Sequence, residues 1–460
     1  MMAGMPSTST TTVAPARACA LRVLRRVFEQ GSYAEKALVS EAAELGPRDR
    51  ALAMRLSYGA VQRRGTLDHL IGQLAGRRPG KLDPQVLGAL RLGLYELLYL
   101  GGSPDYAVVA DAVELAKQRG RGGHGLVNAV LRRAAREGSE ALLDPLGDAT
   151  PAEAAVKHSH PQWIAELWWE ELGPDQARAL MAADNEPGEV ALRANTLVTD
   201  VEKLAAALPV RTHRGPHVPE ALVLEEAFDS HGSALWGEGA FIAQSRAAML
   251  VARTLAPSPG QRVLDLCAAP GGKSTHLAAL MEGRGELIAV ERNRRRAAAL
   301  QRTAERMRAT NVIVEIGDAA LPRELSSFDR VLVDPPCSGL GTLQARPDLR
   351  WRATPESIEQ MRPVQAQILA VGADALRPGG LLVYSTCTIS PTENERLIAD
   401  FLDSHPDFAP DDLAAEMPMF AIQSKDRASV GQASAASGSL LTLPHRDHTA
   451  GFFIARLRKA

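Results

Sequence analysis

Apolar residues recur every three or four positions through the first third of the chain, which is the spacing of amphipathic helices. Over residues 17–140 this pattern includes Leu87, Leu90, Leu94, Leu97 and Leu98, and no segment alternates as a strand does. Gly and Pro residues interrupt the pattern at short intervals and mark the turns. The pattern therefore predicts an independent all-helical bundle.

The pattern changes after residue 151. Residues 152–245 mix two helical segments with short apolar strands at 190–194 and 221–224, and they predict a small α/β subdomain. From residue 246 onward, helical patterns separate short apolar strands at 262–267, 287–291, 312–316, 331–334 and 381–385, and a last strand follows at 452–457. This alternation predicts βαβ units and a parallel sheet over residues 246–460.

Two polar segments and the distribution of cysteines complete the outline. Residues 1–16 are rich in Ser and Thr and carry neither a charged residue nor an apolar core, which predicts a disordered tail rather than a secretory or transit signal. A stretch rich in Ser, Ala and Gly at 424–439 predicts a mobile loop. No segment is apolar enough to span a membrane, and four scattered cysteines form no zinc pattern. We therefore expect a cytoplasmic protein without a metal site.

The net charge of −2 hides an asymmetry along the chain. Residues 17–138 hold 20 Lys and Arg against 12 Asp and Glu, while the rest of the chain holds 32 against 42. A basic helical part joined to an acidic part suggests binding to nucleic acid, because neutralisation of phosphates dominates such binding. A helical domain that happens to be rich in arginine has the same composition, so charge alone leaves both interpretations open.

A glycine-rich loop follows the first strand of the predicted sheet. Asp265 ends that strand, and the loop itself consists of Cys267, Ala268, Ala269, Pro270, Gly271, Gly272 and Lys273. Gly272, Lys273 and Ser274 match the end of a phosphate-binding loop, so an NTPase is a real alternative. Against it, the first glycine of that motif is replaced by Cys267, and Pro270 removes a backbone N–H from a cradle that works by donating them.

Acidic residues follow the next two strands. Glu291 ends the second strand, 20 residues after Gly271, where a carboxylate can hold ribose hydroxyls. Asp318 follows the third strand and can reach an adenine amine, while Asp265 can contact an ammonium group. An acidic residue at a strand end, taken alone, is most often just a cap for the helix that follows. Together with a loop too tight for phosphates, they favour S-adenosylmethionine as the cofactor.

Two cysteines stand after later strands of the sheet, Cys337 behind Asp334-Pro335-Pro336 and Cys387 in Ser385-Thr386-Cys387-Thr388. A single cysteine in such a place is usually a small buried apolar residue. However, ligands of open α/β sheets bind at the carboxyl ends of the strands, and thiolate is a strong nucleophile. Asp334 can hydrogen-bond the amino edge of a cytosine. Attack on C6 of that base would prepare C5 to accept a methyl group.

These motifs resemble those of RNA cytosine-C5 methyltransferases of the Sun/Nop type, and Glu393-Asn394-Glu395 extends the match. Residues 17–140 resemble the NusB RNA-binding fold. The combination is similar to bacterial 16S rRNA methyltransferases of the RsmB (Sun/Fmu) type, over nearly the whole chain after residue 16. The resemblance implies a NusB-like bundle, a small RNA-binding α/β subdomain (152–245) and a Rossmann-like methyltransferase domain (246–460) in a monomer that acts on small-subunit rRNA.

The resemblance also implies residue roles. Cys387 would be the nucleophile, Cys337 would assist product release, and Asp334 would position the base. The segment Arg346-Pro347-Asp348 also matches, and we assign it to the substrate face. Glu291 and Ala450 depart from the family pattern, in which Asp is usual at both positions. The alternatives are a phosphate-binding-loop NTPase and a non-catalytic RNA-binding factor for assembly or antitermination.

Overall fold

The computed structural model describes residues 13–118, 122–323, 325–422 and 437–460. Most of the predicted tail and nearly all of the predicted 424–439 loop lie outside these ranges. Within the described part, Pro15 and Ala16 already belong to the first helix, so the predicted tail was too long by at least two residues. The chain divides into two compact units, which are described in turn.

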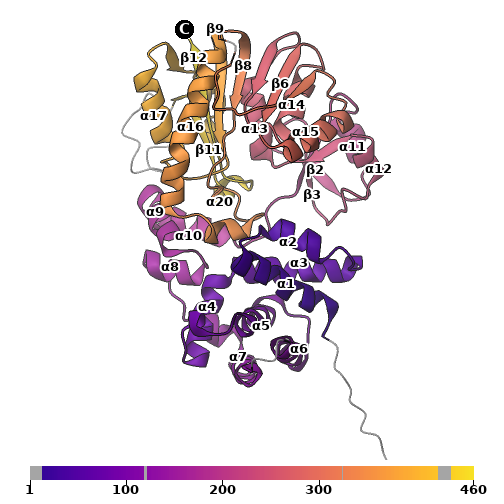
Figure 1. The fold of residues 1–460 in the computed structure, drawn as a ribbon, viewed down its shortest axis with the longest axis vertical. Coiled ribbons are helices and arrows are strands. Elements are labelled where there is room, and N and C mark those ends of the chain that lie inside the picture. Colours follow the sequence, from indigo (N-terminus) through magenta and orange to yellow (C-terminus); the bar gives the residue numbers. More distant parts are fainter. Residues whose placement is uncertain (1–12, 119–121, 324, 423–436) are drawn as a thin grey trace, which may run out of the picture. The chain divides into compact units, whose positions relative to one another are not determined.

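The first unit runs to Trp169 and also takes in Ala177–Asn185 and Arg346–Arg352. Its helices, indigo to magenta in Figure 1, are α1 (Pro15–Gln30), α2 (Ala34–Glu41), α3 (Pro47–Gln62), α4 (Arg64–Ala75), α5 (Pro84–Tyr95), α6 (Asp105–Lys117), α7 (His124–Leu143), α8 (Pro151–Lys157) and most of α9 (Gln162–Leu172) and α10 (Pro174–Ala183), with the short turns η1 (Pro79–Lys81) and η2 (Glu96–Leu100). The helical bundle predicted from the apolar spacing is therefore confirmed.

Local sequence explains where several of these helices begin. Pro occupies the first turn of α1, α3 and α5, where its missing N–H costs nothing. Asp83 caps α5 by accepting a hydrogen bond from the backbone of Gln85. The core between the helices is built largely from Leu, Ala and Val, and Leu24, Leu56 and Leu67 are fully buried in it.

A short segment from late in the sequence completes the helical unit. Its turn η3 (Pro347–Trp351) contributes Arg350, which is fully buried and donates hydrogen bonds to the carbonyl oxygens of Ser159 and Asp184. The Trp351 indole donates to the Val61 carbonyl oxygen at 2.7 Å. Asp348 is only 3% exposed and accepts from the Ala34 backbone N–H. The assignment of Asp348 to the substrate face was therefore wrong, because its carboxylate is buried and hydrogen-bonded inside the helical unit.

The second unit contains Glu170–Gln176, Glu186–Ala345 and Ala353–Ala460. It begins with a small antiparallel sheet in the order β2-β3-β1-β4. The elements of this part are β1 (Ala191–Ala194), α11 (Val201–Ala207), β2 (Thr212–Arg214), β3 (Ala221–Leu224), α12 (Ala234–Gly237) and β4 (Phe241–Ala243). The sheet packs its own apolar core around Leu192, Leu222 and Phe241, which confirms the predicted α/β subdomain.

The large sheet has the order β10-β12-β9-β8-β5-β6-β7, and β11 pairs with β12. The elements are α13 (Arg246–Leu255), β5 (Arg262–Asp265), α14 (Gly272–Leu280), β6 (Glu286–Glu291), α15 (Arg294–Arg306), β7 (Val312–Ile316), β8 (Phe328–Val333), α16 (Pro355–Ala375), β9 (Leu376–Thr386), α17 (Glu395–Ser404), β10 (Phe408–Pro410), α18 (Leu413–Glu416), η4 (Pro418–Phe420), β11 (Ser439–Thr442), α20 (Pro444–Asp447) and β12 (Phe452–Lys459).

Strands β5 to β9 are parallel, as the alternating pattern predicts, and β12 adds antiparallel to β9. Helices α13 and α16 pack against β8 and β9. This arrangement is a Rossmann-like sheet with an antiparallel addition at one side, so the predicted fold class is confirmed.

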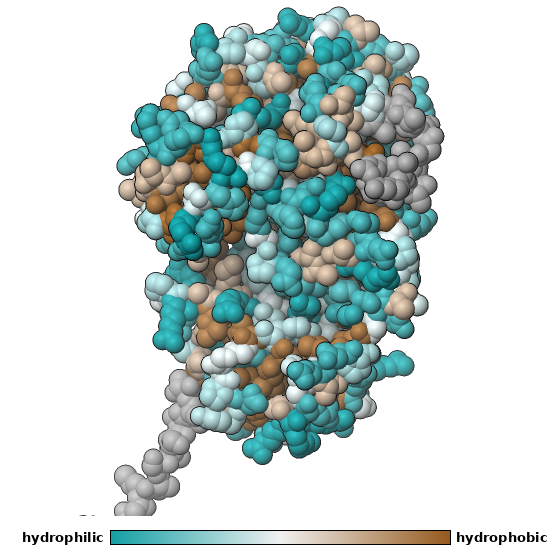
Figure 2. Space-filling model, turned by 180° about the vertical axis from the view of Figure 1, so that it is seen from behind, coloured by the Kyte–Doolittle hydropathy of each residue, from teal (hydrophilic) through white to brown (hydrophobic). Residues whose placement is uncertain are grey.

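The face of the molecule in Figure 2 is mainly hydrophilic and carries smaller apolar areas. Among the residues that the structure describes, no helix is long and apolar enough to cross a membrane.

Candidate active site

The sequence-predicted residues gather at one edge of the large sheet, where the parallel strands β5, β6, β8 and β9 end. The registers explain this convergence: Asp265 is paired with Leu332, and Val333 with Tyr384. Asp334 and Ser385 are therefore neighbours just beyond the paired strands, and the Ser385 hydroxyl donates to Asp334 Oδ1 at 3.0 Å.

The glycine loop turns the chain from β5 into α14. Gly271 has φ +105°, which is a backbone conformation that favours glycine, and an added Cβ would lie 2.8 Å from Leu300 Cδ1. Ala268 and Ala269 are buried, while Pro270 is exposed. Cys267 is half-buried, and burial followed by the charges of Asp334 and Asp265 raises the pKa of its thiol, which keeps it protonated at neutral pH.

Asp265 lies beneath this loop and is 1% exposed. Its Oδ2 accepts a hydrogen bond from the Ser274 hydroxyl at 2.7 Å, but its buried Oδ1 has no hydrogen-bond partner within the protein. Burial raises the pKa of Asp265 to about 6, although the Ser274 hydrogen bond opposes the rise. A buried acceptor without a donor is costly, so this oxygen suits an ammonium or hydroxyl group of a ligand.

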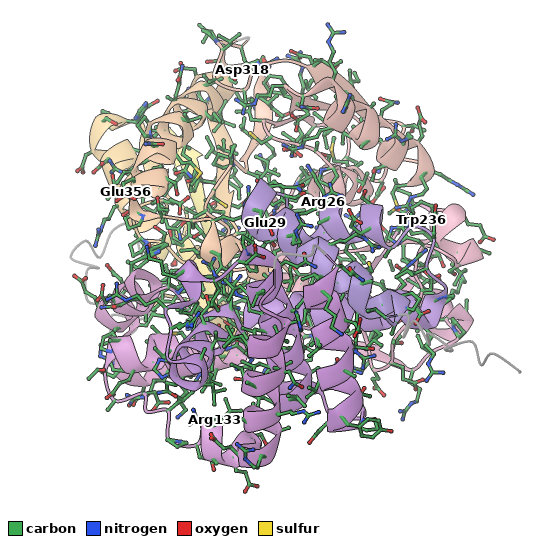
Figure 3. All side chains as sticks on the ribbon, turned by 60° about the horizontal axis from the view of Figure 1, so that its bottom comes forward. Arg26, Glu29, Arg133, Trp236, Asp318 and Glu356 are labelled. Carbon is green, nitrogen blue, oxygen red and sulfur yellow. The ribbon has the colours of Figure 1, made fainter. Side chains whose placement is uncertain are left out.

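The other two acids differ in their surroundings. Glu291 is 5% exposed; its Oε1 accepts from the Asn293 backbone N–H at 2.8 Å, and its Oε2 lies 3.3 Å from Arg296 Nη2. Asp318 is exposed, two residues beyond β7, and accepts from the Ala320 backbone N–H. In Figure 3, Asp318 lies at the outer margin of the view. Glu291 is thus held in one orientation, while Asp318 is open to water.

The two cysteines predicted from the sequence meet at this edge. Cys337 Sγ lies 3.4 Å from Cys387 Sγ, within hydrogen-bonding distance for sulfur. The hydrogen bond to Cys387, then burial, then the charge of Cys387 raise the pKa of Cys337 well above its usual value. Cys337 is therefore protonated at neutral pH, and its thiol lies within hydrogen-bonding distance of Cys387.

A charge pair lies beside the cysteines. Lys273 Nζ donates to Asp334 Oδ2 at 2.6 Å. Burial alone would lower the pKa of Lys273, but Asp334 and then the charge of Cys387 outweigh it, and the net direction is upward. Lys273 is therefore a cation whose charge stabilises both Asp334 and a thiolate at Cys387.

Glu393 connects the two cysteine loops, a role that the sequence did not show. Its fully buried carboxylate accepts from the Ser338 backbone N–H at 2.9 Å, from the Ser338 hydroxyl at 2.6 Å and from Gln365 Nε2 at 3.0 Å. The hydroxyls of Ser338 and Thr388 are 2.6 Å apart, and each is next in sequence to a cysteine. The only signal in the sequence was the acidic motif six residues after Cys387.

Arg193 is a second residue whose position the sequence did not explain. It is 1% exposed on β1, and its guanidinium donates to the Gly272 carbonyl oxygen at 3.2 Å and to the Thr275 hydroxyl at 2.9 Å. Burial lowers the pKa of Arg193 to about 9, so it is charged at neutral pH. The small sheet therefore supports the first turn of α14 and, through it, the glycine loop.

This donor and acceptor set fits a nucleoside cofactor better than a nucleoside triphosphate. The orphaned oxygen of Asp265 and the carboxylates of Glu291 and Asp318 offer acceptors for an ammonium group, a ribose and an amine. A triphosphate needs backbone N–H groups and a lysine that is available to it. Here Pro270 has no N–H, and Lys273 is bonded to Asp334.

Comparison with known proteins agrees with this geometry. The family model described as 16S rRNA methyltransferase RsmB/F matches residues 252–458. The NusB family matches residues 14–136, and a RsmF/B-like ferredoxin-like domain matches residues 160–231.

Some relatives match over nearly the whole length of both chains. A protein of Synechocystis sp. named "Probable ribosomal RNA small subunit methyltransferase B" is 37% identical over 97% of this chain and 99% of its own length. "Ribosomal RNA small subunit methyltransferase B" of Thermus thermophilus is 37% identical over 96% and 97%. The crystal structure of PH0851 superposes with a TM-score of 0.77 at 27% identity, over 97% of this chain and 99% of that one. The chain therefore belongs to the 16S rRNA methyltransferase RsmB/F family.

Proposed function

We propose that this protein transfers a methyl group from S-adenosylmethionine to C5 of a cytosine in small-subunit rRNA, through a covalent bond between Cys387 and C6 of the base. The observation that carries the proposal is the 3.4 Å contact between Cys337 Sγ and Cys387 Sγ at the sheet edge that also holds the glycine loop. Membership of the family and the rRNA named in its description support the substrate class.

The chain's own residues account for the nucleophile. A thiolate at Cys387 receives an S–H hydrogen bond from Cys337 and the positive charge of Lys273 nearby. It attacks C6 of the cytosine, forming the sulfur–carbon bond while the electron pair of the C5=C6 double bond moves toward C5. When bound, S-adenosylmethionine supplies an electrophilic methyl group. This division of one difficult substitution into two easier steps is the advantage of covalent catalysis.

Asp334 would hold the base in place. Its Oδ1 accepts from the Ser385 hydroxyl and its Oδ2 from Lys273, so two hydrogen bonds fix the orientation of the carboxylate. Such a carboxylate can accept a hydrogen bond from the cytosine amino group. A uracil offers a carbonyl oxygen at the same position, which a carboxylate repels, and this contrast would favour cytosine.

Release requires that the C5 proton passes to solvent water, that the C5–H electron pair restores the C5=C6 double bond, and that the Cys387–C6 bond breaks. Cys337 is the nearest group that exchanges a proton with Cys387, and we assign it to this later stage. Because the bond must break with the electron pair returning to Cys387 sulfur, a donor that stabilises the thiolate favours release.

The direct test is transfer of an isotope-labelled methyl group from S-adenosylmethionine to a 16S rRNA transcript, followed by mass-spectrometric mapping of 5-methylcytosine. We expect labelled 5-methylcytosine with the wild-type protein and none with Cys387→Ser. Calorimetry with S-adenosylhomocysteine and with ATP tests the NTPase alternative. Tight ATP binding without S-adenosylhomocysteine binding would reject the proposed cofactor.

A further inference from the structure

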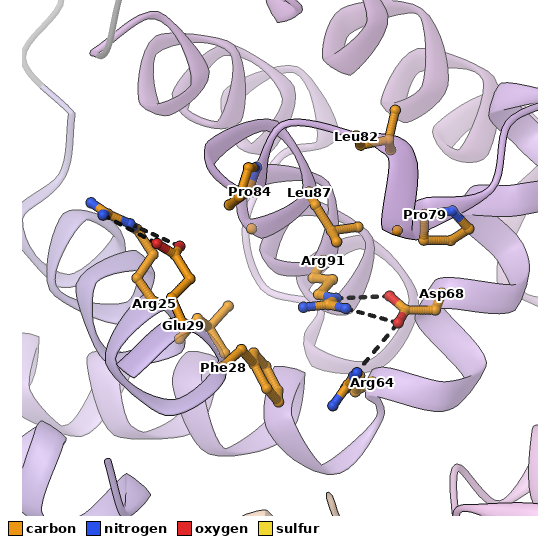
Figure 4. Close-up of a pocket in the computed structure, with 13 residues that line it drawn as sticks. Arg25, Phe28, Glu29, Arg64, Asp68, Pro79, Leu82, Pro84, Leu87 and Arg91 are labelled. Atoms are coloured by element: carbon orange, nitrogen blue, oxygen red, sulfur yellow. Dashed lines mark hydrogen bonds and ion pairs between the residues drawn. The ribbon is translucent and has the colours of Figure 1, made fainter. Parts of the chain in front are cut away.

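The helical unit contains a pocket that the methyl-transfer site does not use. It opens between α1, η1, α4 and α5, and its cavity volume is about 290 Å³ (Figure 4). Leu82, Pro84 and Leu87 form an apolar wall, and Phe28, Arg64 and Arg91 also line the pocket. Small-molecule sites begin at about 300 Å³, so the pocket is about as large as the smallest such sites and cannot admit a duplex.

The charges of the pocket do not balance. Asp68 forms a two-point ion pair with Arg91, with Nε–Oδ1 and Nη2–Oδ2 distances of 2.7 and 2.8 Å, and it also lies 3.6 Å from Arg64 Nε. Arg25 is paired with Glu29 at the rim. Two guanidinium groups therefore share one carboxylate, which leaves one positive charge in surplus.

Arg64 is the member of this set that lacks a full partner. Burial, followed by the positive charge of Arg91, lowers the pKa of Arg64, and Asp68 only partly opposes this. An anion beside Arg64 would compensate the surplus charge. A phosphate does so well, because the fork of guanidinium N–H groups matches its oxygen atoms.

An aromatic ring stands next to this charge. The guanidinium carbons of Arg64 and Arg91 lie 4.8 and 4.9 Å from the centre of the Phe28 ring, and Arg64 is also 5.1 Å from the Trp351 ring. These contacts hold the guanidinium groups in fixed orientations. An arrangement of aromatic and arginine side chains is the one on which unpaired nucleobases stack.

We propose that this pocket, between α1, α4 and α5, binds one unpaired nucleotide of RNA, with its phosphate on Arg64 and its base between Phe28 and the apolar wall at Leu87. The inference rests on the proposed function for the identity of the RNA and adds a recognition site to it. Bases in a duplex are stacked and cannot enter a pocket, so the site selects a single-stranded or bulged position.

The first test needs no variant. A 16S rRNA fragment carrying 4-thiouridine is bound to the full-length protein, irradiated and digested, and cross-linked peptides are identified by mass spectrometry. We expect cross-links in the peptides that contain Phe28 or Leu87. Cross-links confined to other parts of the chain would overturn the proposal.

The second test compares two arginine variants of equal charge. Arg64→Gln should raise KM for RNA. It should also make the slope of log K against the logarithm of the salt concentration less steep by about one unit, as the loss of one phosphate contact does. Arg133→Gln is the control, because Arg133 is an exposed residue of α7 that is paired with Glu137 and does not line the pocket. Figure 3 shows Arg133 far from Glu29 at the pocket rim. Equal effects of both variants would overturn the proposal.

Phe28→Leu separates stacking from charge. It should weaken RNA binding roughly tenfold while the salt dependence stays that of the wild type. Unchanged affinity would reject the nucleotide. If the wild type binds and cross-links RNA here without methylating it, the proposed function fails and this site stands. If methylation proceeds and neither cross-links nor variant effects appear, only this site fails.

Discussion

Cys337 Sγ and Cys387 Sγ lie 3.4 Å apart, although 50 residues separate them in the sequence. The distance is longer than the roughly 2.05 Å of a disulfide, so the two are separate thiols. The raised pKa of Cys337 keeps its thiol protonated at neutral pH. We infer from this difference that the two cysteines have unequal roles.

The first prediction uses this asymmetry. Cys387→Ser should abolish methyl transfer and should give no covalent RNA adduct, because a serine hydroxyl is scarcely ionised at neutral pH. Cys337→Ala should still permit attack by Cys387 but should slow release. A protein–RNA adduct that survives denaturing gel electrophoresis is therefore expected with Cys337→Ala and should vanish in the double variant.

The reverse result would exchange the two roles, that is, adducts with Cys387→Ala and none with Cys337→Ala. If neither substitution changes methyl transfer, both cysteines are ordinary core residues and the covalent mechanism is wrong.

The second prediction concerns Glu393, a positioning residue. Glu393→Ala would leave the Ser338 N–H without its acceptor, at a cost of about 1–3 kcal/mol, and the loop that carries Cys337 would shift. We expect kcat to fall while the affinity for S-adenosylhomocysteine is unchanged. Glu393→Gln retains one acceptor oxygen and should recover part of kcat.

The rate at which iodoacetamide alkylates Cys387 provides a further readout for Glu393. This alkylation rate should change in Glu393→Ala, because Cys337 would no longer lie within hydrogen-bonding distance of Cys387. An unchanged alkylation rate together with wild-type kcat would show that Glu393 is only a core residue.

The third prediction separates the two acids assigned to the cofactor. Glu291 is buried and oriented by the Asn293 N–H, so Glu291→Ala should weaken S-adenosylhomocysteine binding by about 1–3 kcal/mol in calorimetry. Asp318 is exposed, water competes for its hydrogen bonds, and Asp318→Ala should cost less. Equal affinities of the wild type and Glu291→Ala would contradict the placement of the ribose.

The fourth prediction is a dependence of stability on pH in the helical unit. Burial raises the pKa of Asp184 to about 7, against the opposing charge of Arg350, whereas an unfolded aspartate titrates near about 3.9. Between these values the folded protein holds a proton that the unfolded chain has released. The contribution of Asp184 to stability is therefore complete below about pH 4 and is lost as the pH rises to about 7.

Asp184→Asn removes this titration. Compared with the variant, the wild type should lose free energy of unfolding as the pH is raised from 4 to 7, as measured by hydrogen exchange of amides in α3 and α10. A difference between wild type and variant that stays constant over this range would show that Asp184 is ionised throughout.

Much of the site was predictable because the parallel strands place their carboxyl ends at one edge. The alternation of short apolar strands with helices is visible in the sequence, and it predicts that the residues after each strand converge at this edge of the sheet. Asp265, Glu291, Asp334 and the two cysteines are examples. The glycine loop was readable as well, since a left-handed conformation at Gly271 is a local property of the backbone.

The remainder depends on contacts between distant parts of the chain, which no local pattern encodes. Arg350 looks like a surface residue in the sequence, because buried arginines are rare without partners. Only the fold brings the carbonyl oxygens of Ser159 and Asp184 to its guanidinium group, and these hydrogen bonds offset the cost of burying the charge. Likewise, the strand pattern indicates that two cysteines follow neighbouring strands, but the 3.4 Å between their sulfur atoms is a property of the fold. Glu393 sets that separation by holding the Ser338 loop, because a buried carboxylate must gather its donors from wherever the fold supplies them.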